Sequence, residues 1–417
     1  MNQLFFVNPE RDTHTPPILI PAALLLMCDV RRPSRVGLDA SFPAFQLDRL
    51  DLTTLVAVQR SSRVSKVAYP TGQPPWLPPT DIDQAPPSPP TPESPTTPLQ
   101  EILNVAASSP GGGGDANSNV RTVAVKWLLF EKGRNTTTTS PLDLAIEAAN
   151  LQRLAPHCHG RVPRLRAVAH CPDGSPGFVG LAMDFVRGCA LHKLFYSFPH
   201  GLQEDFIRAI LWQLTTIFQD IQNEGYVYRD LKLPNVLVAD SGIVSLIDFH
   251  SADRASHAVG PAGTRHVRAP EACGDQARYA MSCDLFSLGI VTYELATGRP
   301  VLDTFERSLG TELHSQRATV DDVSALVQFP PTMSPDLRSF ILATLEPDPR
   351  RRFGCIPHAL TAGERGSGDA EPMFDVSWSA VRSHQFFGCD PTAPTDADIR
   401  RVASAYAEEI DMQLAGL

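Results

Sequence analysis

The chain has 417 residues, a formal net charge of −10 at pH 7 and eight cysteines. This length predicts two or three domains, or one two-lobed domain with additions, and the negative charge disfavours a general nucleic-acid or membrane-surface binder. Because the cysteines are scattered without paired spacing, we expect reduced thiols and an intracellular protein, cytoplasmic or nuclear.

Residues 1–45 contain no motif that we can interpret, and we assign them to an N-terminal extension. Their apolar stretch, residues 18–28, is too short to span a bilayer. It also lacks the basic region of a signal peptide, since Glu10 and Asp12 flank Arg11. We therefore expect this stretch to pack against the rest of the chain, and we predict no membrane segment.

The next two segments differ sharply in composition. Residues 50–69 carry spaced apolar side chains around a polar turn, which predicts two strands. Residues 70–119 are rich in proline and end in four glycines, so they cannot bury a core, and we predict a disordered insertion. It could dock proline-binding SH3 or WW domains, but we favour a tolerated surface loop because lengthening a loop costs little free energy.

Regular structure is predicted to resume at residue 120. Residues 120–130 form an apolar strand that carries Lys126, and residues 141–154 form a helix with an apolar stripe beside Glu147. Residues 162–171 and 178–185 are predicted as two further strands. Residues 204–224 are predicted as a long amphipathic helix.

The most informative stretch follows, at residues 226–250. An apolar run ends before Asp230, Lys232 and Asn235, and a strand, a turn and a second strand then lead to Asp248. Two carboxylates, an ammonium and an amide are thus expected on adjacent strand ends. Phosphoryl transfer requires such a set, because one group orients the attacking hydroxyl and oxygen ligands bind Mg²⁺.

The segments YRDLKLPN and DFH resemble the H-R-D-L-x-x-x-N and D-F-G motifs of the eukaryotic protein kinase family. The resemblance implies that Asp230 is the catalytic base and that Lys232 steadies the transferred phosphate. It also implies that Asn235 and Asp248 hold Mg²⁺. Tyrosine before Arg229 is typical of the AGC group of cyclic-nucleotide-dependent-like serine/threonine kinases.

The same resemblance assigns an ATP site in the first part of the chain. The segment VAVK matches the V-A-I-K strand, so Lys126 is expected to reach the ATP phosphates with Glu147 as its partner. Met183 falls at the position beside the adenine. Where the family has a glycine-rich loop ending in valine, this chain has Ser62 and Ser65 at two glycine positions, with Val67 at the end of the motif.

Further segments match the large lobe of the family. In GTRHVRAPE, Thr264 is expected near Asp230 and Lys232, and Glu271 is expected to pair with Arg352. Asp284 is expected to hold the catalytic loop from beneath. The end of the domain looks AGC-like, but residues 388–417 lack the F-x-x-F motif of many AGC tails.

The resemblance therefore implies an α+β fold, the bilobal protein kinase fold. We expect the domain over residues 46–388, with a small lobe to 186, a large lobe from 187 and a tail over 389–417. The expected reaction is transfer of the γ-phosphate of Mg-ATP to serine or threonine hydroxyls of protein substrates by a monomer. Two alternatives stay open: a pseudokinase scaffold, favoured by Ser62, Ser65 and His250 at glycine positions, and a small-molecule kinase.

Overall fold

The computed structural model describes residues 54–58, 62–70, 120–128, 141–170, 178–275, 278–300, 327–358, 372–388 and 394–415. The expectations for the N-terminal extension, for the insertion after residue 70 and for the turn of the glycine-loop hairpin lie outside these residues. The predicted boundaries of the extension, the two lobes and the tail stay predictions.

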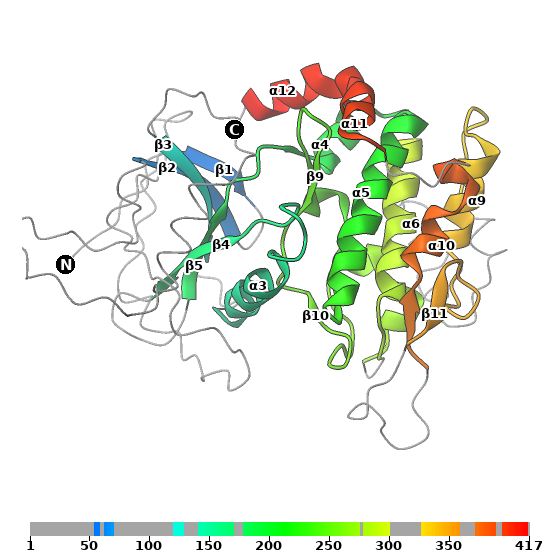
Figure 1. Cartoon of the computed structure of the whole chain (residues 1–417), viewed down its shortest axis with the longest axis horizontal. Helices are drawn as coiled ribbons and strands as arrows, with labels where there is room; N and C mark the ends of the chain where they lie inside the picture. The colour runs from blue at the N-terminus through cyan, green and yellow to red at the C-terminus, as the bar shows by residue number, and fades with distance from the viewer. Residues whose placement is uncertain are drawn as a thin grey trace, which may run out of the picture.

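A five-stranded antiparallel sheet forms the smaller part of the described protein (Figure 1). Its order is β1 (Thr54–Val58), β2 (Ser62–Pro70), β3 (Val120–Leu128), β5 (Phe178–Asp184) and β4 (Leu165–His170). Helix α3 (Pro141–Leu154) packs against β4 and β5. The structure confirms the predicted strands and helix. The strands form here because alternating apolar residues suit a sheet with one covered face.

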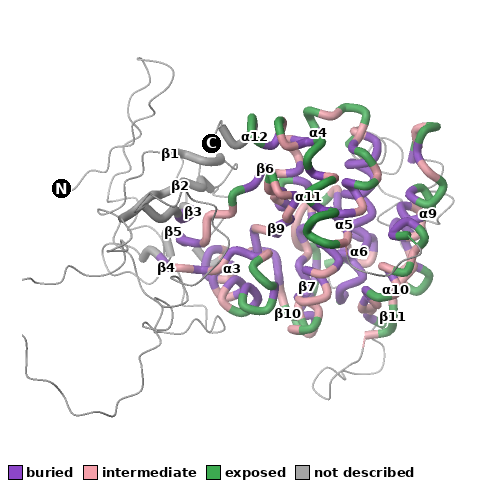
Figure 2. The backbone as a smooth tube through the Cα atoms, turned by 45° about the horizontal axis from the view of Figure 1, so that its top comes forward, coloured by how far each residue is buried: buried purple, intermediate pink, exposed green. Residues whose placement is uncertain are grey.

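Helices make up most of the larger part. Helix α6 (Ser282–Thr297) is buried along its whole length, and α5 (Glu204–Asn223) packs beside it with one apolar face. Figure 2 shows both as largely buried tubes surrounded by more exposed helices. These are α4 (Leu191–Ser197), α9 (Pro335–Thr344) and α10 (Trp378–Arg382).

The segment over residues 226–250, which contains Asp230 and Asp248, consists of short strands and turns between the sheet and these helices. A three-stranded sheet joins β6 (Cys189–Ala190), β8 (Val236–Val238) and β9 (Val244–Leu246). Strands β7 (Tyr226–Val227) and β10 (Asp253–Arg254) pair separately, and the 3₁₀ turn η2 (Leu233–Asn235) precedes β8. The remaining short elements are η3 (Arg265–Val267), η4 (Pro270–Ala272), β11 (Cys355–Pro357), β12 (Phe374–Val376) and η5 (Gln385–Phe387).

Two helices near the C-terminus were not predicted. They are α11 (Asp396–Ala403), which packs on α5, and α12 (Ala407–Ala415), which packs on α4, with the turn η6 (Ser404–Tyr406) between them. Tyr406 stacks on Phe206, and its hydroxyl accepts a hydrogen bond from the amide of Gln203 at 2.8 Å. The sequence signal was present, since Thr395 and Asp398 form a capping box.

No helix within the described ranges is long and apolar enough to cross a membrane.

Candidate active site

Asp230 lies in the loop between β7 and η2 and is almost fully buried. Its Oδ1 accepts hydrogen bonds from the backbone N–H (2.8 Å) and the hydroxyl (2.6 Å) of Thr264. Its Oδ2 accepts from Lys232 Nζ at 2.8 Å and from Asn235 Nδ2 at 3.1 Å. The loop approaches closely because residue 263 is glycine, at φ 65°, where a Cβ would lie 2.1 Å from the carbonyl oxygen of Arg229.

Asp284, at the start of α6, supports this loop as the sequence led us to expect. Its carboxylate accepts the backbone N–H groups of Tyr228 and Arg229 at 2.7 and 2.8 Å. Arg229 has a φ of 70°, a left-handed conformation that costs a non-glycine residue about 1–3 kcal/mol. Burial raises the pKa of Asp284 to about 6, although the two amide donors lower it.

Lys126 joins the sheet, helix α3 and the end of β9 in one buried cluster. Its Nζ donates to Glu147 Oε2 at 2.7 Å and to Asp248 Oδ1 at 2.9 Å. Burial alone would lower the pKa of Lys126, but Asp248 and Glu147 raise it above its ordinary value. Burial would likewise raise the pKa of Asp248, but Lys126 and His250 hold it below its ordinary value. Lys126 and Asp248 are therefore charged at neutral pH. Burial raises the pKa of Glu147, although Lys126 lowers it.

The cluster also offers oxygen ligands for a cation. Asn235 Oδ1 is buried and has no hydrogen-bond partner among the described residues, although its amide nitrogen bonds the carbonyl of Asp230 at 2.9 Å. A buried oxygen without a donor is costly unless something else satisfies it. Within the described part of the chain, the two side chains that donate to Asp248 both bond Oδ1, which leaves Oδ2 for another ligand. These oxygens fit Mg²⁺, which prefers carboxylate and amide oxygens.

Asn150 is a part of the site that the sequence reasoning missed. It lies on α3, one turn after Glu147, and its Nδ2 donates to the carbonyls of Phe249 at 2.9 Å and Ala252 at 2.8 Å. Helix α3 is thereby fixed to the segment that follows Asp248. A buried amide on the same helical stripe as Glu147 was the available signal.

Arg229 is already bonded in this conformation. Its guanidinium donates to the Ser251 carbonyl at 2.5 Å, to the Tyr279 hydroxyl at 3.4 Å and to Asp253 Oδ2 at 3.3 Å. The side chain is only slightly exposed. A negative partner for this arginine is therefore supplied by the chain itself.

Glu271 and Arg352 form the expected pair beneath the site. Arg352 Nη1 and Nη2 donate to the two oxygens of Glu271 at 2.6 and 3.0 Å. The other three N–H groups of Arg352 donate to the carbonyls of Glu346, Pro347 and Ser282. All five donors of the buried guanidinium are thus used, which marks a structural role.

The residues assigned to the nucleotide by resemblance lie on the sheet. Met183 is buried on β5 and pairs in register with Ala124. On β2, Ser62 and Ser65 pair with Leu128 and Val125. On the same strand, Val64 is the residue that pairs with Lys126, and Val67 pairs with Val123. Contact of Ser62, Ser65, Val67 and Met183 with a nucleotide stays a prediction.

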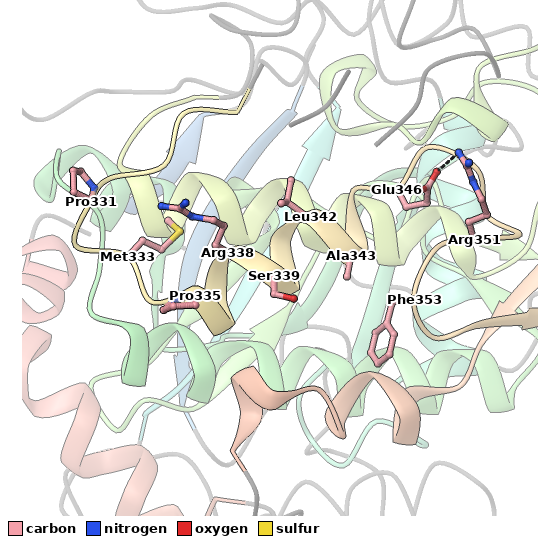
Figure 3. A pocket seen from close by; sticks show the side chains of 10 residues that line it. All are labelled: Pro331, Met333, Pro335, Arg338, Ser339, Leu342, Ala343, Glu346, Arg351 and Phe353. Atoms are coloured by element: carbon pink, nitrogen blue, oxygen red, sulfur yellow. Dashed lines mark hydrogen bonds and ion pairs between the residues drawn. The ribbon is translucent and has the colours of Figure 1, made fainter. Parts of the chain in front are cut away.

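A separate hollow of about 730 Å³ lies on α9 and the segments before and after it (Figure 3). Arg351 donates to Glu346 at 2.9 Å at its edge. None of the predicted site residues lines this hollow. Figure 1 places α9 on the side of the large lobe away from the sheet, so the hollow is not part of the site around Asp230.

The chain belongs to the protein kinase domain family, whose model matches residues 114–362. This match agrees with the two-part fold. Members of this family use ATP, typically with Mg²⁺, so the family defines the fold and the class of nucleotide.

Curated relatives include the CBL-interacting protein kinase 25 of rice, which is 31% identical over 224 residues, 51% of this chain and 40% of the relative. The yeast serine/threonine-protein kinase KIC1 is 30% identical over 179 residues, 42% of this chain and 16% of the relative. The Arabidopsis serine/threonine-protein kinase AtPK2/AtPK19 is 29% identical over 42% of this chain and 36% of the relative. The chain spans less than half the length of each of these relatives.

Proposed function

We propose that this protein is an ATP-dependent serine/threonine protein kinase. The observation that carries the proposal is the convergence of Lys126, Glu147 and Asp248 in one buried cluster. The loop that holds Asp230 and the unpartnered oxygen of Asn235 completes the set. A degenerate scaffold would have no reason to retain every one of these groups, since buried charges and unpaired oxygens reduce stability.

In the proposed reaction, a serine or threonine hydroxyl attacks the γ-phosphorus of ATP, and the bond to the β-phosphate oxygen breaks. Asp230 orients the hydroxyl and accepts its proton, while Lys232 and Lys126 neutralise charge on the phosphate oxygens. Asn235 and Asp248 would hold Mg²⁺, which neutralises further charge on the phosphates. Positioning and charge neutralisation supply most of the rate in such transfers.

Two other functions compete with this proposal. A pseudokinase would keep the fold without transfer, and Ser62, Ser65 and His250 at glycine positions favour it. A small-molecule kinase would transfer phosphate to an alcohol. The bonds of Thr264 to Asp230 disfavour the second, because they tie the segment that carries protein substrates in this family to the catalytic loop.

A phosphotransfer assay on generic protein substrates and on small alcohols separates the three functions. We expect labelled serine or threonine with the wild type, and a fall of about 10²–10⁴-fold with Asp230→Asn, because an amide cannot accept the hydroxyl proton. A melting curve of the variant checks its fold. Transfer to alcohols alone, or equal rates in wild type and variant, would overturn the proposal.

We also propose an AGC-like kinase that has lost most of the AGC preference for arginine upstream of the target residue. Ala190 and Pro234 stand where cyclic-nucleotide-dependent kinases have substrate-binding glutamates, and neither can bind a guanidinium. At a third such position the chain keeps an acid, Glu294, which is only 7% exposed. A degenerate peptide library tests this: a flat or acidic profile is expected, and strong selection for arginine two or three residues upstream would contradict it.

The remaining proposals concern partners and location. We propose a monomer that acts on protein substrates, with SH3 or WW domains as candidate partners of residues 70–119. We propose an intracellular location, cytoplasmic or nuclear. It is supported by the free thiols of cysteines 158, 189, 273, 283 and 355.

A further inference from the structure

His250 occupies the position where the family's metal motif has glycine, and the proposed reaction gives it no role. It follows Asp248 by two residues, and its side chain is 34% exposed. Oxygen and nitrogen atoms of Asp230, Asp248 and His250 lie within 4.8 Å of one another. The imidazole therefore stands at the cation site.

The imidazole is held at both of its nitrogens. Nδ1 lies 2.6 Å from Asp248 Oδ1, and Nε2 lies 3.1 Å from the hydroxyl of Ser251. Because a carboxylate only accepts, Nδ1 carries the proton and donates it to Asp248. The backbone on either side is fixed as well, since Asn150 binds the carbonyls of Phe249 and Ala252.

Lys126 and His250 both donate to Asp248 Oδ1, but only the bond from His250 can persist through the proposed reaction. Lys126 also bonds Glu147, and in the proposed reaction it turns to the ATP phosphates. His250 is not needed at the phosphates and can keep its bond to Asp248. The hydrogen bond from His250 is important because Asp248 has a φ of 66°, a strained backbone conformation for a non-glycine residue that requires support from its surroundings.

We infer that His250 is a positioning residue for the divalent cation: it holds Asp248 Oδ1 so that Oδ2 is presented to the metal. The inference rests on the proposed function, because it assigns the cation of that reaction to Asp248 and Asn235. Hydrogen-bond partners of metal ligands fix the orientation of those ligands, and their loss weakens metal binding about 10–100-fold. His250 acts here through Asp248 and not as a ligand itself.

The test measures binding of Mn²⁺, a paramagnetic substitute for Mg²⁺, by electron paramagnetic resonance with a non-hydrolysable ATP analogue present. We expect His250→Ala to weaken Mn²⁺ binding about tenfold or more. His250→Asn should retain most of the affinity, because its amide nitrogen can donate from nearly the position of Nδ1. His257→Ala is the matched control, an exposed histidine of the same segment, and should bind Mn²⁺ like the wild type.

Equal Mn²⁺ affinity in wild type and His250→Ala would overturn the inference, as would equally large losses in His250→Ala and His250→Asn. If His250→Ala does not fold, the comparison of His250→Asn with the wild type decides, and a tenfold loss there would overturn it. As a second readout, His250→Ala should raise the Mg²⁺ concentration for half-maximal transfer much more than it lowers kcat. Metal binding requires no turnover, so an inactive wild type with the expected Mn²⁺ losses would reject only the proposed function.

Discussion

Two buried ion-pair clusters of this protein differ in how completely their polar atoms are bonded. Arg352 and Glu271 form a closed cluster, in which each N–H of the guanidinium has an acceptor. Lys126, Glu147 and Asp248 form an open one, beside Asn235 Oδ1, which has no hydrogen-bond partner in the described part of the chain. Both clusters have the cost of removing charge from water. The closed cluster recovers that cost within the protein, whereas the open one offers oxygen atoms to the proposed Mg²⁺.

The largest expected effect breaks the closed cluster. Arg352→Met should lower the free energy of unfolding by about 3–5 kcal/mol, because it leaves the Glu271 carboxylate unpaired. Urea denaturation measures the loss. Combining Arg352→Met with Glu271→Leu should recover much of it, since the double variant leaves no unpaired charge. A double variant as unstable as the single one would show that the pair is not the source of the loss.

A smaller loss of stability is expected in the open cluster. With Mg²⁺ present, Lys126→Met should lower the free energy of unfolding by less than Arg352→Met does, since the two carboxylates left behind can bind the cation. Phosphoryl transfer should fall at least about 100-fold, because Lys126 no longer neutralises the phosphates. Added Mg²⁺ should reduce the stability loss. A loss equal to that of Arg352→Met, unchanged by Mg²⁺, would remove the distinction between the clusters.

A still smaller effect concerns Asp284, whose pKa burial raises from 3.8 to about 6. A carboxyl with a raised pKa binds its proton more tightly in the folded protein, so its stabilising contribution is full below pH 3.8 and is lost as pH rises through 6. Between pH 7 and 5 the wild type should gain about 1 kcal/mol relative to Asp284→Asn. Parallel stability curves for the two proteins over that range would contradict the shift.

The smallest effect is expected at Arg229, whose carboxylate partner, like that of Arg352, is supplied by the chain itself. Its guanidinium already donates to Asp253, Tyr279 and the Ser251 carbonyl. In related kinases this arginine often binds a phosphate on the activation segment. The acceptor position, three residues before Gly263, is Gly260 here, which cannot be phosphorylated. Phosphatase treatment and Ser256→Ala should therefore leave transfer unchanged. An enzyme that phosphatase silences, with Ser256→Ala reproducing the effect, would show that a phosphate completes this site.

The sequence by itself determined the chemical groups of the site and most of the elements that carry them. Asp230, Lys232 and Asn235 lie within one loop, so their spacing along the chain already restricts their geometry. The strands and helices around them follow from local apolar periodicity. The family match agrees with the kinase fold that these motifs imply.

Only the tertiary structure decided which distant groups meet and which polar atoms stay unpaired. Asn150 is 99 residues from Phe249, and the helices near the C-terminus pack on α4 and α5 through residues far away in the chain. Likewise, the sequence places His250 at a glycine position but does not show that its imidazole bonds Asp248. Such contacts depend on how side chains pack together, and no local pattern specifies that packing.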